Sequence, residues 1–315
     1  MNKDKDIKKV LNRLSHWDQK LDFQNPVKKN VDIKAYLNYY GLNFQDVDLH
    51  FGNIEIDETE IIVQIFKTKE SKGIIFILHG YLNHVGHLKH IIQYLTKHNY
   101  TVISYDLQGH GLSNGKRASI ESFSDYVVTL EKLMKKSRDE LEGPFYVMGH
   151  STGGAIAINY VLQNPLHHFD KVILVAPLIR SNYWLLTRIG YSLANSFPFI
   201  NKLKMYIQKN SANKTHMNFT KRDPLQLNTV PLAWLKALMK WNEEISTYNP
   251  VNTETLVIQG NKDTTIDWKY NVKFITEKFN NLQIVQIDEG KHELLNESRQ
   301  IRAALFSAIL RFLKE

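Results

Sequence analysis

The pattern of hydrophobic and polar positions changes near residue 73 of this 315-residue chain. Before it, residues 47–56 and 61–67 alternate polar and apolar positions, which predicts an antiparallel hairpin. After it, runs of consecutive apolar residues alternate with amphipathic helical stretches, which is typical of parallel βαβ units with strands covered on both faces. The runs are 73–78, 100–105, 145–148, 171–175, 255–259 and 282–287. We therefore expect an α/β fold with a mostly parallel, doubly wound sheet and helices on both faces.

Two segments depart from this pattern. Residues 1–45 are charged and aromatic, and the helical spacing of Ile7, Val10, Leu11 and Leu14 predicts an extension that packs on the domain. Between Pro177 and Pro250 there is no strand pattern, only helix-like stretches rich in aromatic residues. This predicts a helical lid inserted over the sheet. The expected units are an extension at 1–45, a core formed by 46–177 and 251–315, and a lid at 178–250.

The composition indicates a globular protein, because 43% of the residues are hydrophobic and 23% are charged. Cysteine is absent, which excludes disulfides, thiolate metal sites and a cysteine nucleophile. The charged start of the chain lacks the apolar run of a secretory signal, and no stretch reaches the ~20 apolar residues of a membrane span. We therefore expect a cytoplasmic protein, with peripheral contact to the inner membrane surface as a further prediction.

Most of the net charge of +8 lies in the predicted lid, which has ten basic and three acidic side chains. Basic residues mixed with aromatic ones suit a surface that meets an anionic membrane. A solvated basic face over an aromatic core explains the same pattern and stays open. Nucleic acid is not an expected partner, since no recognised motif for it accompanies the charge.

The candidate nucleophile is Ser151, in Gly149-His150-Ser151-Thr152-Gly153-Gly154. This stretch follows a predicted strand and opens a predicted helix, and such a tight turn holds a serine with its Oγ exposed. Ser113 also fits the G-x-S-x-G pattern, but no strand precedes it, so we interpret it as a loop serine. His150 is expected to pack inward from the turn.

A serine at its ordinary pKa needs a base, and the base needs an orienting acid. Asp263 follows the strand at 255–259, and His292 follows the strand at 282–287. Both loops should open at the edge where Ser151 lies, because ligands of such sheets bind beyond the carboxyl ends of the strands. Asp267 and Asp288 remain alternatives for the acid.

The oxyanion of an acyl-transfer reaction needs preplaced donors, normally backbone N–H groups. One is expected from Thr152, directly after the nucleophile. The other is expected from Tyr81, because Gly80 allows the loop after the strand at 73–78 to turn its amide toward the site. A plain glycine turn is the alternative interpretation. This chemistry requires no metal and no organic cofactor.

Five blocks of the sequence together resemble the monoacylglycerol lipase and bacterial lysophospholipase branch of the α/β-hydrolase family. They are His79-Gly80-Tyr81, residues 106–113, residues 149–154, Gly260-Asn261-Lys262-Asp263 and Gly290-Lys291-His292, and the similarity extends over about residues 47–313. The resemblance implies the α/β-hydrolase fold with a Ser151, Asp263 and His292 triad. It also implies that Asp106 and His110 stabilise a loop beside the site.

The resemblance also bears on the substrate. The stretch Arg222-Asp223-Pro224-Leu225-Gln226, followed by Trp234 and Trp241, is most similar to the lid of bacterial lysophospholipases. It therefore implies a serine carboxylic-ester hydrolase that releases a fatty acid from a lysophospholipid. The alternatives are a monoacylglycerol lipase or a short-chain carboxylesterase, and more remotely an acyltransferase or a non-catalytic binding protein on the same fold.

Overall fold

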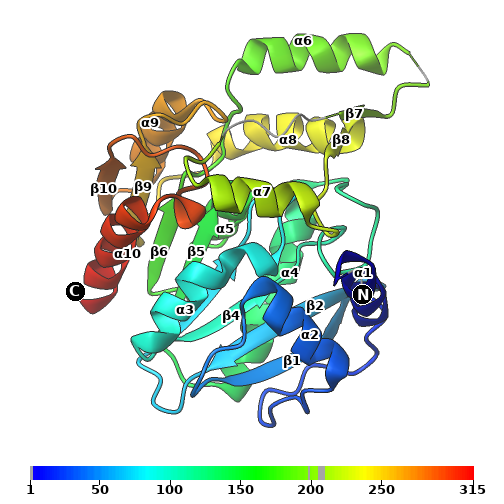
Figure 1. The fold of residues 1–315 in the computed structure, drawn as a ribbon. Helices are drawn as coiled ribbons and strands as arrows, with labels where there is room; N and C mark the ends of the chain where they lie inside the picture. Colours follow the sequence, from blue (N-terminus) through cyan, green and yellow to red (C-terminus); the bar gives the residue numbers. More distant parts are fainter. Residues whose placement is uncertain (1–2, 198, 205–209) are drawn as a thin grey trace.

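The centre of the molecule is an eight-stranded sheet, seen in a computed structural model that describes residues 3–197, 199–204 and 210–315 (Figure 1). The strands are β1 Asp48–Ile56, β2 Thr59–Lys67, β3 Ile74–Leu78, β4 Thr101–Tyr105, β5 Phe145–His150, β6 Lys171–Val175, β9 Glu254–Gly260 and β10 Leu282–Ile287. Their spatial order is β1-β2-β4-β3-β5-β6-β9-β10. β2 pairs antiparallel with β1 and with β4, and the other neighbours are parallel. The predicted hairpin and the predicted mostly parallel sheet are confirmed.

Burial explains why the central strands read as unbroken apolar runs. Every residue of β3, β4 and β5 is buried, so both faces of these strands are covered. The helices α3 Lys89–Lys97 and α10 Arg299–Lys314 pack together on one face of the sheet (Figure 1). The helices α4 Phe123–Glu140 and α5 Thr152–Gln163 cover the other face, and α9 Trp268–Lys278 lies between β9 and β10 in the chain.

The first 45 residues form two helices, α1 Lys3–Leu14 and α2 Val31–Tyr40. The four apolar side chains of α1 with helical spacing are all buried, as that spacing predicts; they are Ile7, Val10, Leu11 and Leu14. The stretch between the helices runs beside β1, where the Leu21 amide donates to the Asn53 carbonyl. Gly52 permits this approach, because a Cβ at that position would lie 2.5 Å from the Leu21 backbone.

We call residues 178–250 the cap. It contains α6 Trp184–Asn195, α7 Lys214–Arg222 and α8 Leu232–Glu244, which lie together along one edge of the sheet with α6 outermost (Figure 1). The prediction that this segment lacks strands is wrong, because β7 Lys202–Lys204 and β8 Thr229–Pro231 form a short antiparallel pair. Strands of three residues are too short to show an alternating pattern. Within the described chain, no helix combines the length and apolar character that crossing a bilayer demands.

Candidate active site

Ser151 occupies the sharp turn between β5 and α5. Its backbone has φ 52° and ψ −114°, a strained conformation for a residue with a side chain. Two glycines allow the strand and helix to approach so closely. A Cβ on Gly149 would lie 2.2 Å from the Gly153 carbonyl oxygen, and one on Gly153 would lie 2.2 Å from the Leu78 carbonyl oxygen. The Ser151 amide donates to the Val175 carbonyl at 3.0 Å, which anchors the turn to β6.

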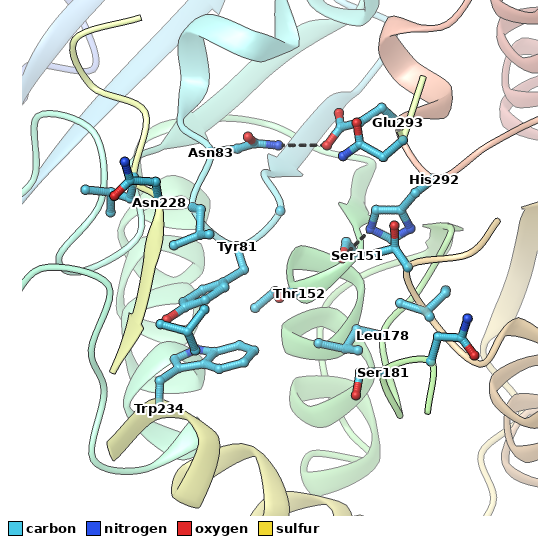
Figure 2. Close-up of a pocket in the computed structure, with 18 of the residues that line it drawn as sticks. Tyr81, Asn83, Ser151, Thr152, Leu178, Ser181, Asn228, Trp234, His292 and Glu293 are labelled. Atoms are coloured by element: carbon cyan, nitrogen blue, oxygen red, sulfur yellow. Dashed lines mark hydrogen bonds between the residues drawn. The ribbon is translucent and has the colours of Figure 1, made fainter. Parts of the chain in front are cut away.

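The structure brings Ser151, His292 and Asp263 into one hydrogen-bonded chain (Figure 2). His292 Nε2 lies 2.9 Å from Ser151 Oγ, and His292 Nδ1 lies 2.7 Å from Asp263 Oδ2. Asp263 is ionised and therefore accepts from Nδ1–H, which leaves Nε2 free to accept the serine proton. The other carboxylate oxygen accepts from the backbone amides of Thr265 and Ile266 at 2.8 and 3.3 Å, so the orientation of the acid is fixed.

The pKa values of this pair move in opposite directions. Burial lowers the pKa of the His292 imidazole, but the Asp263 charge and hydrogen bond outweigh burial and raise it above its ordinary value. Burial alone would raise the pKa of Asp263, yet its contact with His292 and the two backbone amides lower it. The acid is therefore ionised at neutral pH, and the imidazole is a stronger base than a free one.

The alternatives from the sequence have other partners. Asp267 accepts from the Tyr270 amide at the start of α9, and exposed Asp288 accepts from Asn261. Ser113 is buried, where it donates to the Asp106 carbonyl at 2.6 Å and accepts from the amide of a β2 residue. Ser113 is thus a structural loop serine, and Asp263 is the acid that contacts the imidazole.

Asp106 ties together two loops beside the site, as the family resemblance implies. Its carboxylate accepts from the Val85 amide at 2.8 Å and from the Leu112 amide at 2.7 Å. His110 is buried against the ring of Tyr81, with 5.3 Å between ring centroids, and burial lowers the pKa of this imidazole to about 4. His110 is therefore an uncharged packing group at neutral pH.

The loop after β3 lies against the nucleophile. A Cβ on Gly80 would be 3.4 Å from Ser151 Cβ, so the backbone of this loop reaches the serine. The side chain of Tyr81 fixes the next residue, because its hydroxyl donates to the Ala118 carbonyl at 2.6 Å and its ring stacks on Trp234 at 3.7 Å. Among the hydrogen bonds of the described residues, neither the Tyr81 nor the Thr152 backbone amide donates one. Both amides are available to a substrate oxygen.

Two further residues touch the site: His150 packs inward as expected, and Glu293 was missed from the sequence. His150 is buried, but its ring also bridges to the next loop, since Nε2 donates to the His292 carbonyl at 2.9 Å. Glu293 directly follows His292 and is buried beside Asn83, whose amide donates to it at 3.2 Å. Adjacency to His292 was the one signal in the sequence for Glu293, and adjacency does not tell whether a side chain points into a pocket.

A cavity of about 610 Å³ opens beside Ser151 and is covered by the cap. Its wall is mostly apolar, and the cap supplies these side chains: Leu178, Leu186, Leu203, Met217, Val230, Trp234, Leu235 and Leu238. Figure 2 shows Asn83 and Glu293 at the upper end, Trp234 and Leu178 at the lower end, and Tyr81 across from Ser151 and His292 between the two ends. The size is typical of pockets for small organic ligands (about 300–1,000 Å³).

One buried cluster outside the triad has the residue types of a metal site, namely His84, His87 and Asp223. Nε2 of each imidazole lies 2.8 Å from Asp223 Oδ2. His84 Nδ1 accepts from the Gly86 amide at 3.1 Å, so its proton is on Nε2. A metal would need the lone pair of that nitrogen. The cluster is therefore a hydrogen-bonded one, in which both histidines and Tyr40 donate to Asp223.

Comparisons with known proteins show the family and the fold of this chain. A model of the family described as serine aminopeptidase, S33, matches residues 69–299. The monoglyceride lipase of Rattus norvegicus is 27% identical over 233 residues, which cover 72% of this chain and 77% of that protein. Phospholipase YtpA of Bacillus subtilis is 24% identical over 243 residues, which cover 74% and 92%. A crystal structure of monoglyceride lipase from Saccharomyces cerevisiae has a TM-score of 0.73 at 19% identity and covers 83% of this chain and 93% of that one.

Proposed function

We propose that this chain, which belongs to the serine aminopeptidase S33 family, hydrolyses the ester bond of single-chain acyl lipids through an acyl-enzyme. The α/β-hydrolase fold and the family make the protein a serine hydrolase. The observation that carries the proposal is the hydrogen-bonded chain of Ser151, His292 and Asp263 in a mostly apolar cavity. Relatives named monoglyceride lipase and phospholipase support a lipid ester as the substrate.

In the first half of the proposed reaction, Ser151 Oγ attacks the ester carbonyl while His292 Nε2 takes the hydroxyl proton. Asp263 keeps Nδ1 protonated and stabilises the imidazolium. The Tyr81 and Thr152 amides bind the negative oxygen of the tetrahedral intermediate. The intermediate then collapses: the bond to the alcohol breaks, the imidazolium gives its proton to the leaving oxygen, and the acyl group stays on the serine.

In the second half, water replaces the alcohol. His292 takes a proton from this water, whose oxygen attacks the acyl-serine carbonyl. The second tetrahedral intermediate collapses with protonation of Ser151 Oγ, and a fatty acid leaves. The same two amides stabilise both intermediates, because each carries its negative oxygen at the same place.

The cap supports a lipid substrate through its outer surface as well as through the cavity. Several large apolar side chains of α6 and the segment after it are exposed, by between 47% and 79%: Leu185, Leu186, Ile189, Leu193, Phe197 and Phe199. Exposed Arg188 and Lys202 flank them. Exposed apolar side chains with cations in the same segment suit insertion at the interface of an anionic membrane. We therefore propose that the cap docks on the inner membrane surface of the cell while the rest of the molecule stays in the cytoplasm.

Sedimentation with vesicles tests the docking. Wild type should bind vesicles with 30% phosphatidylglycerol at least tenfold more tightly than vesicles of pure phosphatidylcholine. Replacing both Leu185 and Leu193 with serine should remove most of this binding. Leu166→Ser changes a still more exposed leucine outside the cap (91% exposed) and should leave binding unchanged. Equal binding of the double variant and wild type would contradict the docking proposal.

A substrate panel tests the hydrolase proposal. It contains a monoacylglycerol and a lysophospholipid with the same acyl chain, the matching diacyl lipids, a short p-nitrophenyl ester and an aminoacyl p-nitroanilide. Wild type should cleave the single-chain lipids at least 100-fold faster than the diacyl ones, and Ser151→Ala should cleave none. Cleavage of the anilide without cleavage of any lipid would show a peptidase instead.

A further inference from the structure

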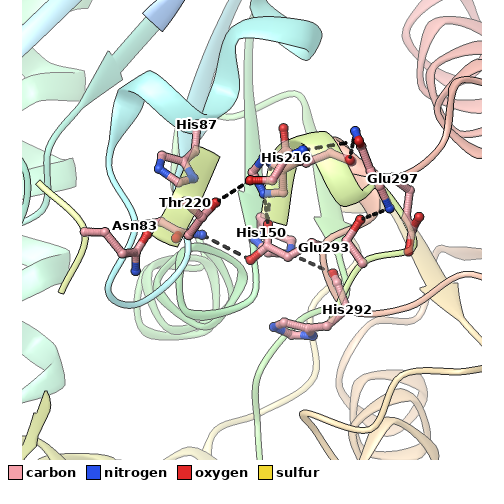
Figure 3. Close-up of polar contacts among 12 residues, drawn as sticks. Asn83, His87, His150, His216, Thr220, His292, Glu293 and Glu297 are labelled. Atoms are coloured by element: carbon pink, nitrogen blue, oxygen red, sulfur yellow. Dashed lines mark hydrogen bonds and ion pairs between the residues drawn. The ribbon is translucent and has the colours of Figure 1, made fainter. Parts of the chain in front are cut away.

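The polar end of the cavity is built around one buried carboxylate, Glu293. It is 7% exposed and lines the cavity next to the catalytic histidine in the chain. The Asn83 amide donates to Oε1 at 3.2 Å, the Asn296 amide approaches Oε2 at 3.4 Å, and His216 Nε2 lies 3.9 Å from Oε2 (Figure 3). Asn83 and His216 also line the cavity, so this end is a wall of hydrogen-bonding groups.

The charge of this wall contrasts with that of the whole protein. Among the cavity-lining residues that the structure describes, none is lysine or arginine, although the net charge of the chain is +8. Burial lowers the pKa of His216 to about 4, so this imidazole is uncharged at neutral pH. Burial also favours the neutral acid of Glu293, but the protonated imidazoles around it at low pH outweigh burial and lower this pKa to about 2, so the carboxylate is already ionised when these imidazoles lose their protons. The described polar wall therefore carries a negative charge.

The position of Ser151 decides which part of a substrate meets this wall. An ester carbonyl at Ser151 has the acyl chain on one side and the alcohol on the other. The apolar wall that contains Leu178 and Trp234 suits the acyl chain, and in Figure 2 these two side chains lie below Ser151 whereas Asn83 and Glu293 lie above it. The alcohol must then lie against Asn83 and Glu293.

We propose that Glu293, with Asn83 and His216, forms a subsite that binds an uncharged polyol such as glycerol and excludes an alcohol that carries phosphate. This inference rests on the proposed lipid hydrolase function and deepens it. Free hydroxyls of glycerol donate hydrogen bonds to the carboxylate. A phosphate brings a second negative charge into a mostly apolar cavity that supplies no described cationic side chain for it. The enzyme should therefore prefer monoacylglycerol over the lysophospholipid that the sequence favoured.

The test compares three lipids with one decanoyl chain each, dispersed in the same detergent: monodecanoylglycerol, decanoyl lysophosphatidic acid and decanoyl lysophosphatidylcholine. Wild type should have a kcat/KM for the glycerol ester at least 100-fold above that for lysophosphatidic acid. Glu293→Gln keeps the shape and removes the charge, so this ratio should fall at least tenfold. His216→Lys brings an ammonium group beside an unchanged carboxylate and should lower the ratio in the same direction.

The control is Glu289→Gln, which removes the same charge from an exposed side chain in the same loop and should leave the ratio unchanged. If all three lipids are cleaved with similar kcat/KM, if lysophosphatidylcholine is preferred, or if neither variant moves the ratio, the subsite proposal is wrong and the hydrolase proposal stands. If no lipid is cleaved while p-nitrophenyl butyrate is, both proposals fail together. A melting curve identifies a variant that does not fold. In that case the wild-type ratio of kcat/KM between the glycerol ester and lysophosphatidic acid decides whether the subsite proposal holds.

Discussion

Asp223 joins three parts of the chain, and its replacement by asparagine should destabilise the protein strongly. The residue belongs to the cap, directly after α7. Its carboxylate accepts from Tyr40 of α2 at 2.7 Å and from His84 and His87 of the core at 2.8 Å each. All four side chains are buried, so water cannot replace the lost bonds.

The size of the effect follows from the number of donors left unpaired. An asparagine keeps one acceptor oxygen and places an NH₂ group where the other oxygen was. In either orientation of the new amide two donors lose their acceptor: both imidazoles if the oxygen takes the Oδ1 place, or Tyr40 and the Leu225 amide if it takes the Oδ2 place. Each unsatisfied buried donor costs about 1–3 kcal/mol, and relief of the buried charge offsets part of this. We expect Asp223→Asn to lower the free energy of unfolding by about 3 kcal/mol.

Urea denaturation followed by tryptophan fluorescence measures this loss. The control is Asp139→Asn on the exposed side of α4, which should change the free energy of unfolding by less than about 0.5 kcal/mol. A decrease in the free energy of unfolding below about 1 kcal/mol for Asp223→Asn would refute the reasoning, because the cluster would then contribute little to the stability of the fold. If Asp223→Asn stays folded and zinc raises the free energy of unfolding of the wild type, these results would instead favour a metal at this cluster.

Four further predictions concern the site. Since the pKa of His292 is raised and only the neutral imidazole accepts a proton, kcat/KM should rise with pH through a midpoint above 6.5, as a pH–rate profile would show. Asp263→Asn should keep the fold but lower kcat by ~10⁴, measured on a p-nitrophenyl ester, because the imidazole loses its orienting acceptor. Gly153→Ala should fail to give active protein in an expression and activity screen, since its Cβ would lie 2.2 Å from a backbone oxygen of Leu78. Trp234→Ala removes the ring stacked on Tyr81 and should cost about 3 kcal/mol in thermal unfolding.

The sequence predicted the parallel core well for a physical reason. Strands buried on both faces must be apolar at every position, so β3, β4 and β5 are visible as unbroken runs. The turn at Ser151 was equally visible, because only glycine fits at positions 149 and 153. The strands β7 and β8 were missed, since three-residue strands give no period to detect.

Contacts between distant segments could not be predicted from the sequence. Nothing in the local pattern shows that Asp223 meets Tyr40, 183 positions away, or that Asn83 meets Glu293, 210 positions away. The basic cap was visible, but charge counted along the chain does not reveal which side chains face the cavity. Such pairings depend on how the cap and the extension pack on the core, and this is decided by tertiary structure.

Covalent labelling with a fluorophosphonate probe, followed by mass spectrometry of the peptides, tests the central claim most directly. The hydrogen bond of 2.9 Å between Ser151 Oγ and His292 Nε2 predicts rapid labelling at Ser151 alone. Labelling should vanish in Ser151→Ala and slow by at least 100-fold in His292→Ala. Label on another serine such as Ser113, or unchanged labelling of His292→Ala, would contradict the account.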